Sequence, residues 1–167
     1  MTLPYHKLRD KDTFYRHDTS LMKIVIPIRD KLGYVDDTHN KILDLGCRDG
    51  ELVKRLQALG YDAKGIDIRD DYIQDSPDWF IHADAANIPL DDDSIDLITS
   101  RLFFDDLMGL QHLTEQQVYD IHVKECHRIL RPGGLIVSHF DQLPLRGGQY
   151  FQHVHYQHVS TYQVNKH

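Results

Sequence analysis

Residues 42–52 read ILDLGCRDGEL: an apolar segment runs into an acidic turn with two glycines and then into a helix-forming segment. Gly46 permits a tight turn and a close approach of the backbone to a ligand. We expect the backbone N–H groups after it to point outward at a helix start, where they favour a carboxylate or phosphate. Asp44 adds a negative charge that suits an ammonium or sulfonium group and repels a pyrophosphate. The alternative is an ordinary turn in which Asp44 binds only loop amides.

Short apolar segments alternate with amphipathic segments along the rest of the chain. Their composition predicts strands at residues 41–45, 63–68, 79–81, 95–99 and 135–140. Apolar residues at helical spacing predict helices at 51–59 and 114–130; Gly60 ends the first, and the turn 131–134 is expected to stop the second sharply. The alternation predicts βαβ units in an α/β, doubly wound sheet, which binds ligands beyond the carboxyl ends of its strands.

Charge and composition narrow the classes of partner. The chain has 167 residues and a net charge of −7 with neutral histidines, and no long Lys/Arg cluster, so nucleic acid is not an expected partner. No apolar run approaches the ~20 residues that cross a bilayer, so no membrane span is expected. The N-terminus has no apolar core of a signal peptide. The only two cysteines, Cys47 and Cys126, fit a reducing compartment, and a cytoplasmic location is expected.

Four segments carry a further pattern, in this order: ILDLGCRDGEL at 42–52, GIDIRD at 65–70, HADAANIPLDDDSIDLITS at 82–100 and ECHRILRPGGLIVS at 125–138. Together they resemble the motifs of class I S-adenosylmethionine (SAM) dependent methyltransferases, nearest to the ubiquinone-biosynthesis-like group that acts on small molecules. The resemblance implies a Rossmann-like sheet of the class I methyltransferase type. It also implies SAM as cofactor, S-adenosylhomocysteine as product and a small-molecule substrate as methyl acceptor.

The resemblance assigns the glycine-containing loop to cofactor binding, through Asp44, Gly46, Cys47, Arg48 and Gly50. Arg48 departs from the family, because it replaces the middle glycine of the usual turn. Its side chain would either crowd the methionine end of the cofactor or pair with the methionine carboxylate. This departure leaves a second function open: a non-catalytic methyltransferase-like module that binds SAM, its product or a partner protein.

The resemblance also assigns roles to residues that follow the other strands. Asp67 would accept hydrogen bonds from two ribose hydroxyls, with a capping acid as the alternative, and Ile68 would pack against the adenine face. Asp84 would accept a hydrogen bond from the adenine amino group, and the Ala85 amide would reach a ring nitrogen. For Asp84, the alternative role is that of a helix cap. The Ser100 carbonyl would face the methionine end.

A nicotinamide-binding domain is the main structural rival. An acid at the position of Asp67 is expected for either cofactor, so it does not separate the two classes. However, the loop lacks the G-x-G-x-x-G order, and the Asp84-Ala85 segment has no role in a dinucleotide site. The chain reads SRLFF at 100–104, without the Asn/Asp-Pro-Pro-Tyr sequence expected for methylation of exocyclic amines on DNA bases.

No catalytic base stands out, because many methyl transfers need only proximity and alignment of the two reactants. If one is needed, His139 at the end of the fifth strand is the best-placed candidate, and His6, His17 and Asp141 are weaker.

No metal is expected. The acidic run 91–93 is interpreted as a solvated loop. His153, His155 and His158 have no cysteine or nearby carboxylate to complete a site.

The two ends of the chain flank the predicted sheet. Residues 1–33 are expected to form an N-terminal arm and a helix over 20–32 on the substrate side, ahead of a SAM-binding domain at 34–167. After the fifth strand, residues 141–167 have room for a hairpin of 149–158 and 159–164, but not comfortably for the additional helix usual in the family. The C-terminal part is therefore expected to be short or incomplete. The substrate pocket would then be open, absent, or completed by a homodimer partner or another subunit.

Overall fold

The computed structural model describes residues 40–139, 143–144, 150–156 and 159–166. The chain divides into two compact units, Met1–Asn40 and Lys41–His167, and almost all described residues belong to the second. The expected N-terminal arm and helix at 1–33 lie outside the described residues, so they stay a prediction.

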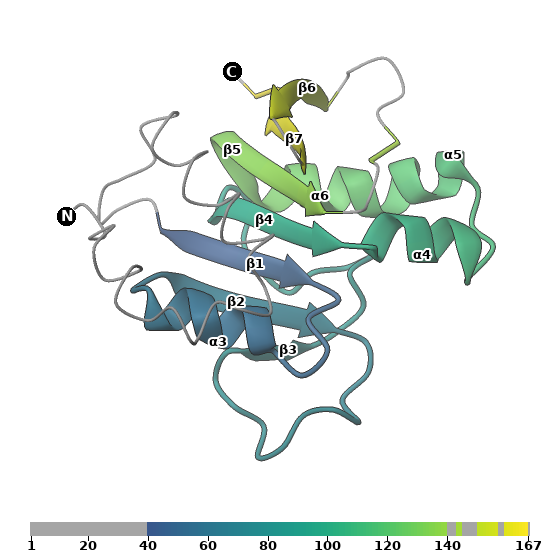
Figure 1. Cartoon of the computed structure of the whole chain (residues 1–167). Helices are drawn as coiled ribbons and strands as arrows, with labels where there is room; N and C mark the ends of the chain where they lie inside the picture. Colours follow the sequence, from purple (N-terminus) through teal and green to yellow (C-terminus); the bar gives the residue numbers. More distant parts are fainter. Residues whose placement is uncertain (1–39, 140–142, 145–149, 157–158, 167) are drawn as a thin grey trace. The chain divides into compact units, whose positions relative to one another are not determined.

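The second unit is built on one seven-stranded sheet with the strand order β3-β2-β1-β4-β5-β7-β6 (Figure 1). Its strands are β1 (Lys41–Leu45), β2 (Asp62–Asp67), β3 (Phe80–His82), β4 (Ile95–Arg101), β5 (Leu130–His139), β6 (Phe151–Tyr156) and β7 (Val159–Val164). The first five strands pair in parallel, and β7 pairs antiparallel with both β5 and β6. The α/β doubly wound prediction is confirmed.

The predicted C-terminal hairpin is present as β6 and β7 and extends the sheet beyond β5. The additional helix that the sequence did not accommodate would fall between His139 and Tyr150, where only residues 143 and 144 are described. Within the described residues, the hairpin is thus the observed C-terminal part of the sheet.

The helices of the second unit are α3 (Glu51–Ala58), α4 (Phe103–Gly109) and a continuous run of α5 (Glu115–Val118), η1 (Tyr119–Val123) and α6 (Lys124–Ile129). The predicted helices at 51–59 and 114–130 are confirmed. Thr114 starts the long helix with a reciprocal capping box to Gln117. The π-helical turn η1 in its middle and the whole of α4 were not predicted.

The long helix ends at Ile129, just before Arg131–Gly134, as the sequence predicted. The Arg131–Gly134 segment itself was expected to be a turn between helix and strand, but the strand already begins at Leu130. It lies inside β5 as a large bulge, because Leu130 pairs with Ile95 and Leu135 pairs with Leu97, which leaves four residues opposite Asp96. The Arg131 guanidinium forms an ion pair with the buried Asp96 carboxylate. This ion pair gives a physical reason for the bulge.

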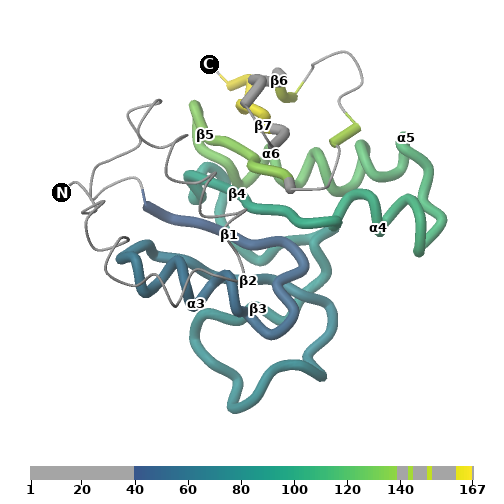
Figure 2. The backbone as a smooth tube through the Cα atoms, in the orientation of Figure 1, coloured from purple at the N-terminus to yellow at the C-terminus, as the bar shows by residue number. Residues whose placement is uncertain are grey.

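The main hydrophobic core joins the sheet to the long helix. Leu43, Ile98 and Ile136 of the sheet pack in one cluster with Val123 and Ile129. Helix α3 packs on β2, where Gln57 Nε2 donates to the Ala63 carbonyl at 3.0 Å. The segments that follow β2 and β3 leave the sheet as long loops (Figure 2).

Candidate cofactor site

The carboxyl ends of the parallel strands lie at one edge of the sheet. Leu45 at the end of β1 pairs with Ile66 of β2 and Ser100 of β4, and Asp67 at the end of β2 pairs with His82 of β3. The arrowheads of β1, β2 and β4 accordingly end on the same side in Figure 1. The segments containing the predicted site residues leave from this edge, where parallel sheets bind ligands.

Asp44 is buried, and its carboxylate is fixed from the neighbouring strand. The Thr99 hydroxyl donates to Asp44 Oδ1 at 2.7 Å, and the two residues are also register partners in β1 and β4. This hydrogen bond orients the negative charge that the sequence placed beside the loop.

The backbone amides of the loop are arranged differently from the prediction. The N–H groups of Gly46 and Cys47 both donate to the Ile66 carbonyl, at 2.9 and 3.1 Å, and the Arg48 N–H donates to Asp67 Oδ2 at 2.9 Å. These three amides therefore join the loop to β2 instead of pointing outward. The expectation that they await a ligand carboxylate was wrong, because the end of β2 already supplies their acceptors.

The Asp67 carboxylate lies where the two segments meet. One oxygen accepts the Arg48 N–H and the other accepts the Arg69 N–H at 3.0 Å. The second bond is the local capping role given as the alternative. A carboxylate has about four acceptor positions, so two oxygens with one partner each retain capacity for further donors. Asp67 is only partly buried, and that capacity is open to a ligand.

Arg48 adopts a left-handed backbone conformation with φ 51°, and its guanidinium lies over the Tyr72 ring, 5.2 Å from the centroid. Arg69 lies over the same ring at 5.0 Å and forms an ion pair with Asp71 at 2.6 Å. The hydrogen bond from Arg69 holds the pKa of the Asp71 carboxyl below its usual value. The Arg48 side chain thus contacts the loop after β2.

The Asp84 segment forms a tight turn after β3. The Ala86 N–H donates to Asp84 Oδ1 at 2.8 Å and the Asn87 N–H donates to the Asp84 carbonyl at 2.9 Å. Asp84 thus closes a turn, and the short helix that the alternative placed after it is not present at residues 85–90. Among the described residues the Ala85 N–H has no hydrogen-bond acceptor, so the turn leaves one donor available. Ile68, the first residue after β2, is 61% exposed.

Cys47 and Gly50 contribute through packing. Burial, followed by the charges of Asp44 and Asp67, raises the pKa of the Cys47 thiol to about 12, so this buried side chain stays protonated and unreactive. Gly50 has φ 73°, and a Cβ there would lie 2.1 Å from the Trp79 ring. A glycine is thus required at the start of α3 for both conformation and space.

Ser100 and His139 lie near the same edge of the sheet. Ser100 is buried, and its hydroxyl is 2.8 Å from the Ser138 hydroxyl. His139 is the last residue of β5 and pairs in register with Arg101. The weaker catalytic candidates His6, His17 and Asp141 lie outside the described residues.

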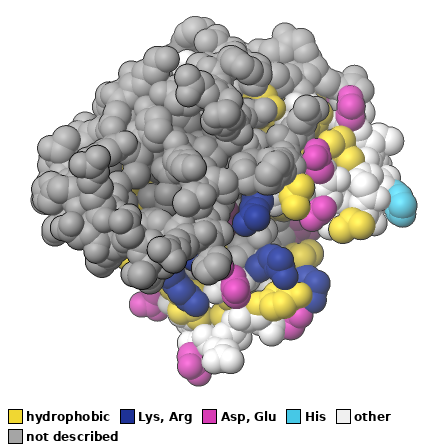
Figure 3. Space-filling view, viewed as in Figure 1, with side chains coloured by type: hydrophobic (Ala, Val, Ile, Leu, Met, Phe, Trp, Pro, Cys, Tyr) yellow, Lys and Arg dark blue, Asp and Glu magenta, His cyan; other side chains and the backbone are white. Residues whose placement is uncertain are grey.

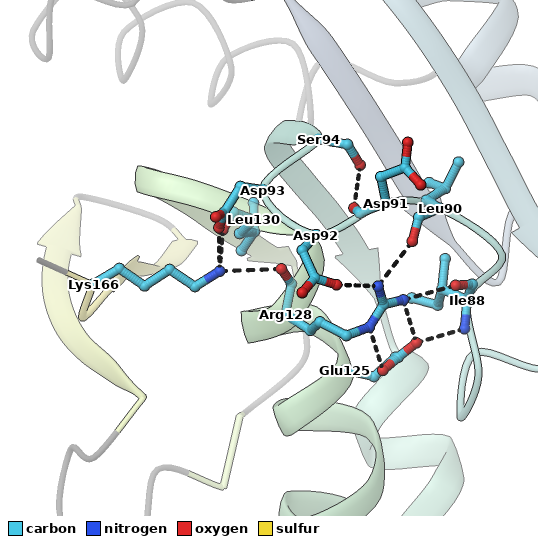
Figure 4. A network of polar contacts seen from close by, with 10 residues as sticks. All are labelled: Ile88, Leu90, Asp91, Asp92, Asp93, Ser94, Glu125, Arg128, Leu130 and Lys166. Atoms are coloured by element: carbon cyan, nitrogen blue, oxygen red, sulfur yellow. Dashed lines mark hydrogen bonds and ion pairs between the residues drawn. The ribbon is translucent and has the colours of Figure 1, made fainter.

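Among the described residues, no group of three or more His, Cys, Asp and Glu side chains is arranged so that it could hold a metal ion. His153 and His155 belong to β6, and His158 lies outside the described residues. The interpretation of 91–93 as a solvated loop was incomplete. Asp92 pairs with Arg128 at 2.7 Å and Asp93 with Lys166 at 2.5 Å (Figure 4).

Residues 43–138 match the protein family described as "Methyltransferase domain", which is more than half of the chain. The chain belongs to this methyltransferase domain family. It is 26% identical over 145 residues to the demethylmenaquinone methyltransferase of Staphylococcus haemolyticus, covering 80% of this chain and 54% of the relative. The chain thus spans about half, or less, of the length of the first curated relatives that it matches.

Solved structures of similar fold agree with this methyltransferase domain. The PH0226 protein of Pyrococcus horikoshii has a TM-score of 0.61 at 17% identity, over 99% of this chain and 94% of that protein. A structure described as a SAM-dependent methyltransferase from Methanosarcina mazei has a TM-score of 0.52 at 25% identity, over 67% of this chain and 56% of that one. The description of this second structure names SAM as the molecule on which its methyltransferase depends.

The carboxyl edge of this methyltransferase domain fits an adenosine group chemically. Asp67 has acceptor capacity for ribose hydroxyls, and the Ala85 N–H is a donor with no acceptor among the described residues. The exposed Ile68 side chain offers an apolar surface at the end of β2. These three features match the donors, acceptors and aromatic face of adenosine.

Several residues around this edge were missed from the sequence. Phe103 follows β4, and its ring lies 3.2 Å from the position that a Cβ on Gly46 would take. It also packs edge-on against His122, with ring centroids 5.8 Å apart. Leu102, before Phe103, has φ 58°, a strained conformation for a leucine. The apolar residues of SRLFF, at 100–104, could have indicated from the sequence that this segment packs against the site.

The surface and the helices add two facts about the methyltransferase domain. On the face seen in Figure 3, the Lys and Arg side chains of the described residues lie among acidic and hydrophobic ones. Within the described part of the chain, every helix is too short or too polar to cross a bilayer.

Proposed function

We propose that the chain is a SAM-dependent methyltransferase that acts on a small-molecule acceptor at the carboxyl edge of β1, β2 and β4. The match to the methyltransferase domain family supports methyl transfer as the class of reaction. The combination of an oriented Asp44, a partly exposed Asp67 and an available Ala85 N–H at one edge supports the location of the site.

The proposed roles follow the contacts of each segment. Asp67 holds the ribose hydroxyls, Asp84 and Ala85 hold the adenine, and Ile68 covers its face. Gly46, Arg48 and Gly50 shape the loop beside the methionine end, together with Ser100 and the packing of Cys47. Asp44 provides a fixed negative charge, 2.7 Å from Thr99, on the side of the sulfonium.

When bound, SAM supplies a methyl group on a positively charged sulfur, which is already a strong electrophile. The protein then has to hold the acceptor atom in line and exclude water. Phe103 is suited to exclude water, because its ring lies against the Gly46 turn and His122. For an acceptor that must lose a proton, His139 remains the proposed base, because the end of β5 lies beside the end of β4.

The proposal includes a small-molecule acceptor, no nucleic acid and a cytoplasmic location. The only two cysteines of the sequence, Cys47 and Cys126, are both buried, which fits a reducing compartment. A homodimer or a partner subunit that completes the acceptor side of the pocket is part of the same proposal.

Methyl transfer from radiolabelled SAM tests this function, with an acceptor panel that includes demethylated quinones, phenols and carboxylic acids. Wild-type protein should label at least one acceptor, and Asp67→Ala should abolish labelling while Asp71→Ala retains it. Binding of S-adenosylhomocysteine is measured in parallel by calorimetry. Absence of both binding and transfer would refute the proposal, and binding without transfer to any acceptor would favour the non-catalytic module.

A further inference from the structure

Strand β4 ends with Arg101 at the carboxyl edge of the sheet, directly after Ser100. Side chains of a strand alternate between the two faces of a sheet, so Arg101 lies on the same face as Thr99, two residues before it. On this face the Thr99 hydroxyl donates to Asp44 at 2.7 Å. Arg101 therefore lies at the end of the sheet face that carries Asp44, the charge proposed to face the sulfonium.

The Arg101 side chain is exposed, and within the described residues it has no hydrogen bond or ion pair. Arg69 and Arg128, by contrast, each pair with a carboxylate. Even Asp105 and Asp106, in the first turn of α4, form no ion pair with Arg101. A guanidinium is always charged and presents its donors in a planar fork that matches a carboxylate. Arg101 is thus available to bind an anion at this edge.

Leu102, the next residue, combines two unfavourable features. Its backbone is left-handed, with φ 58° and ψ 7°, and its side chain is 44% exposed. A leucine is strained in this conformation, which a glycine or an asparagine adopts more easily. The bend lets Phe103 pack against the Gly46 turn while Leu102 itself stays at the surface. Such strain clusters at ligand sites, so it points to a function for the exposed side chain.

We propose that Arg101 and Leu102 bind the methyl acceptor and select a molecule that carries a carboxylate on an apolar ring or chain. The Arg101 guanidinium holds the carboxylate, and the Leu102 side chain packs on the apolar part beside it. Because the chain has a net charge of −7, an anionic acceptor needs such a local cation. The inference rests on the proposed function and goes beyond it by naming the chemical class of the acceptor and the residues that select it.

Two probes with the same apolar body and different charge test this inference, 4-butylbenzoate and 4-butylbenzyl alcohol. Their dissociation constants are measured by calorimetry on protein saturated with S-adenosylhomocysteine, at about pH 8, where the carboxyl group is ionised. Arg101→Gln removes the charge. Leu102→Asn introduces a polar side chain that tolerates the left-handed conformation. Lys124→Gln is the matched control, because Lys124 is also exposed but lies on the long helix.

Wild type should bind the benzoate at least about tenfold more tightly than the alcohol, as expected for a hydrogen bond to a charged group. Arg101→Gln should abolish this preference, and Leu102→Asn should weaken both probes about three- to tenfold. Both variants should keep the wild-type affinity for S-adenosylhomocysteine and the wild-type midpoint of thermal unfolding. Lys124→Gln should behave as wild type in every measurement.

Equal binding of the two probes by wild type, or binding of neither, would overturn the inference. A preference for the benzoate that survives in Arg101→Gln, or an equal loss in Lys124→Gln, would overturn it as well. Each of these results leaves the proposed function standing as long as wild type binds S-adenosylhomocysteine. Failure of wild type to bind S-adenosylhomocysteine would instead refute the proposed function, and the inference with it.

Discussion

Arg48 and Asp67 are 19 residues apart, and the Arg48 N–H donates to Asp67 Oδ2 at 2.9 Å. The bond ties the loop after β1 to the end of β2. The same carboxylate is the proposed acceptor for ribose hydroxyls, so loop geometry and cofactor binding depend on one side chain. The Arg48 side chain extends to Tyr72, and the residue that departs from the usual glycine thus reinforces the same junction.

Asp67→Asn should weaken binding of S-adenosylhomocysteine about 10- to 100-fold, because hydrogen bonds to a charged acceptor contribute about 1.5–3 kcal/mol. Asp71→Asn is the matched control, since Asp71 is exposed and pairs with Arg69 in the same loop. Calorimetry on both variants checks the prediction. Equal affinities for the two variants would show that Asp67 does not contact the ligand.

Arg48→Gly should keep the affinity for S-adenosylhomocysteine within about threefold, because the guanidinium contacts Tyr72 in this structure. Its free energy of unfolding should change by less than about 1 kcal/mol, since relief of the left-handed conformation offsets the lost stacking. Chemical denaturation and calorimetry measure both. A large loss of affinity would mean that Arg48 instead pairs with the methionine carboxylate.

Gly50→Ala should lower the free energy of unfolding by about 2–4 kcal/mol, because the new Cβ would collide with Trp79 at a residue with φ 73°. Gly109→Ala is the control: it lies in α4, where an added Cβ would meet no atom within 4 Å, and it should be neutral or stabilising. Urea denaturation compares them. A Gly50→Ala protein as stable as wild type would contradict the packing of Trp79.

Arg128→Ala should lower the free energy of unfolding by about 1–3 kcal/mol, because it removes the donor to the Leu90 carbonyl and one of the two donors to the Ile88 carbonyl. Lys124→Ala, an exposed change on the same helix, should stay within about 0.5 kcal/mol of wild type. Urea denaturation again provides the comparison. Equal effects would show that the Arg128 contacts add nothing to stability.

The pH dependence of stability should reflect two histidines whose pKa is lowered, in both cases chiefly by burial. His122 faces the charge of Asp84, and His127 faces Lys166 and Asp93. The unfolded chain takes up protons first as pH falls below about 6.5, so the free energy of unfolding should decrease from there toward lower pH. His122→Gln should show a shallower decrease between about pH 5 and 6.5. An identical slope would contradict the buried, uncharged state of His122.

The strands and the two main helices could be predicted from the sequence, because the spacing of apolar residues indicates which side chains of a segment are buried. The hairpin of β6 and β7 was also predicted, as the structure for which residues 149–158 and 159–164 had room after the fifth strand. Helix α4 was missed, since Phe103–Gly109 is short and contains two acidic residues. The bulge at Arg131–Gly134 was missed because it depends on the long-range ion pair to Asp96.

The site was predicted as positions along the chain, and its hydrogen bonds were not. Two of these hydrogen bonds depend on the pairing of β1 with β2 and β4. In one the Arg48 N–H donates to Asp67, and in the other the Thr99 hydroxyl donates to Asp44. The contact of His122 with the Phe103 ring could not be predicted, because it depends on the phase of the helix at the π-helical turn. Such pairings and phases are tertiary properties that local sequence does not specify.

The most direct measurement is a crystal structure of the chain with S-adenosylhomocysteine at saturating concentration. We expect ribose hydroxyls within hydrogen-bond distance of the Asp67 carboxylate, and an adenine ring against Ile68 with a ring nitrogen facing the Ala85 N–H. A ligand bound away from the carboxyl ends of β1 and β2, or a ribose that does not contact Asp67, would contradict the proposed site.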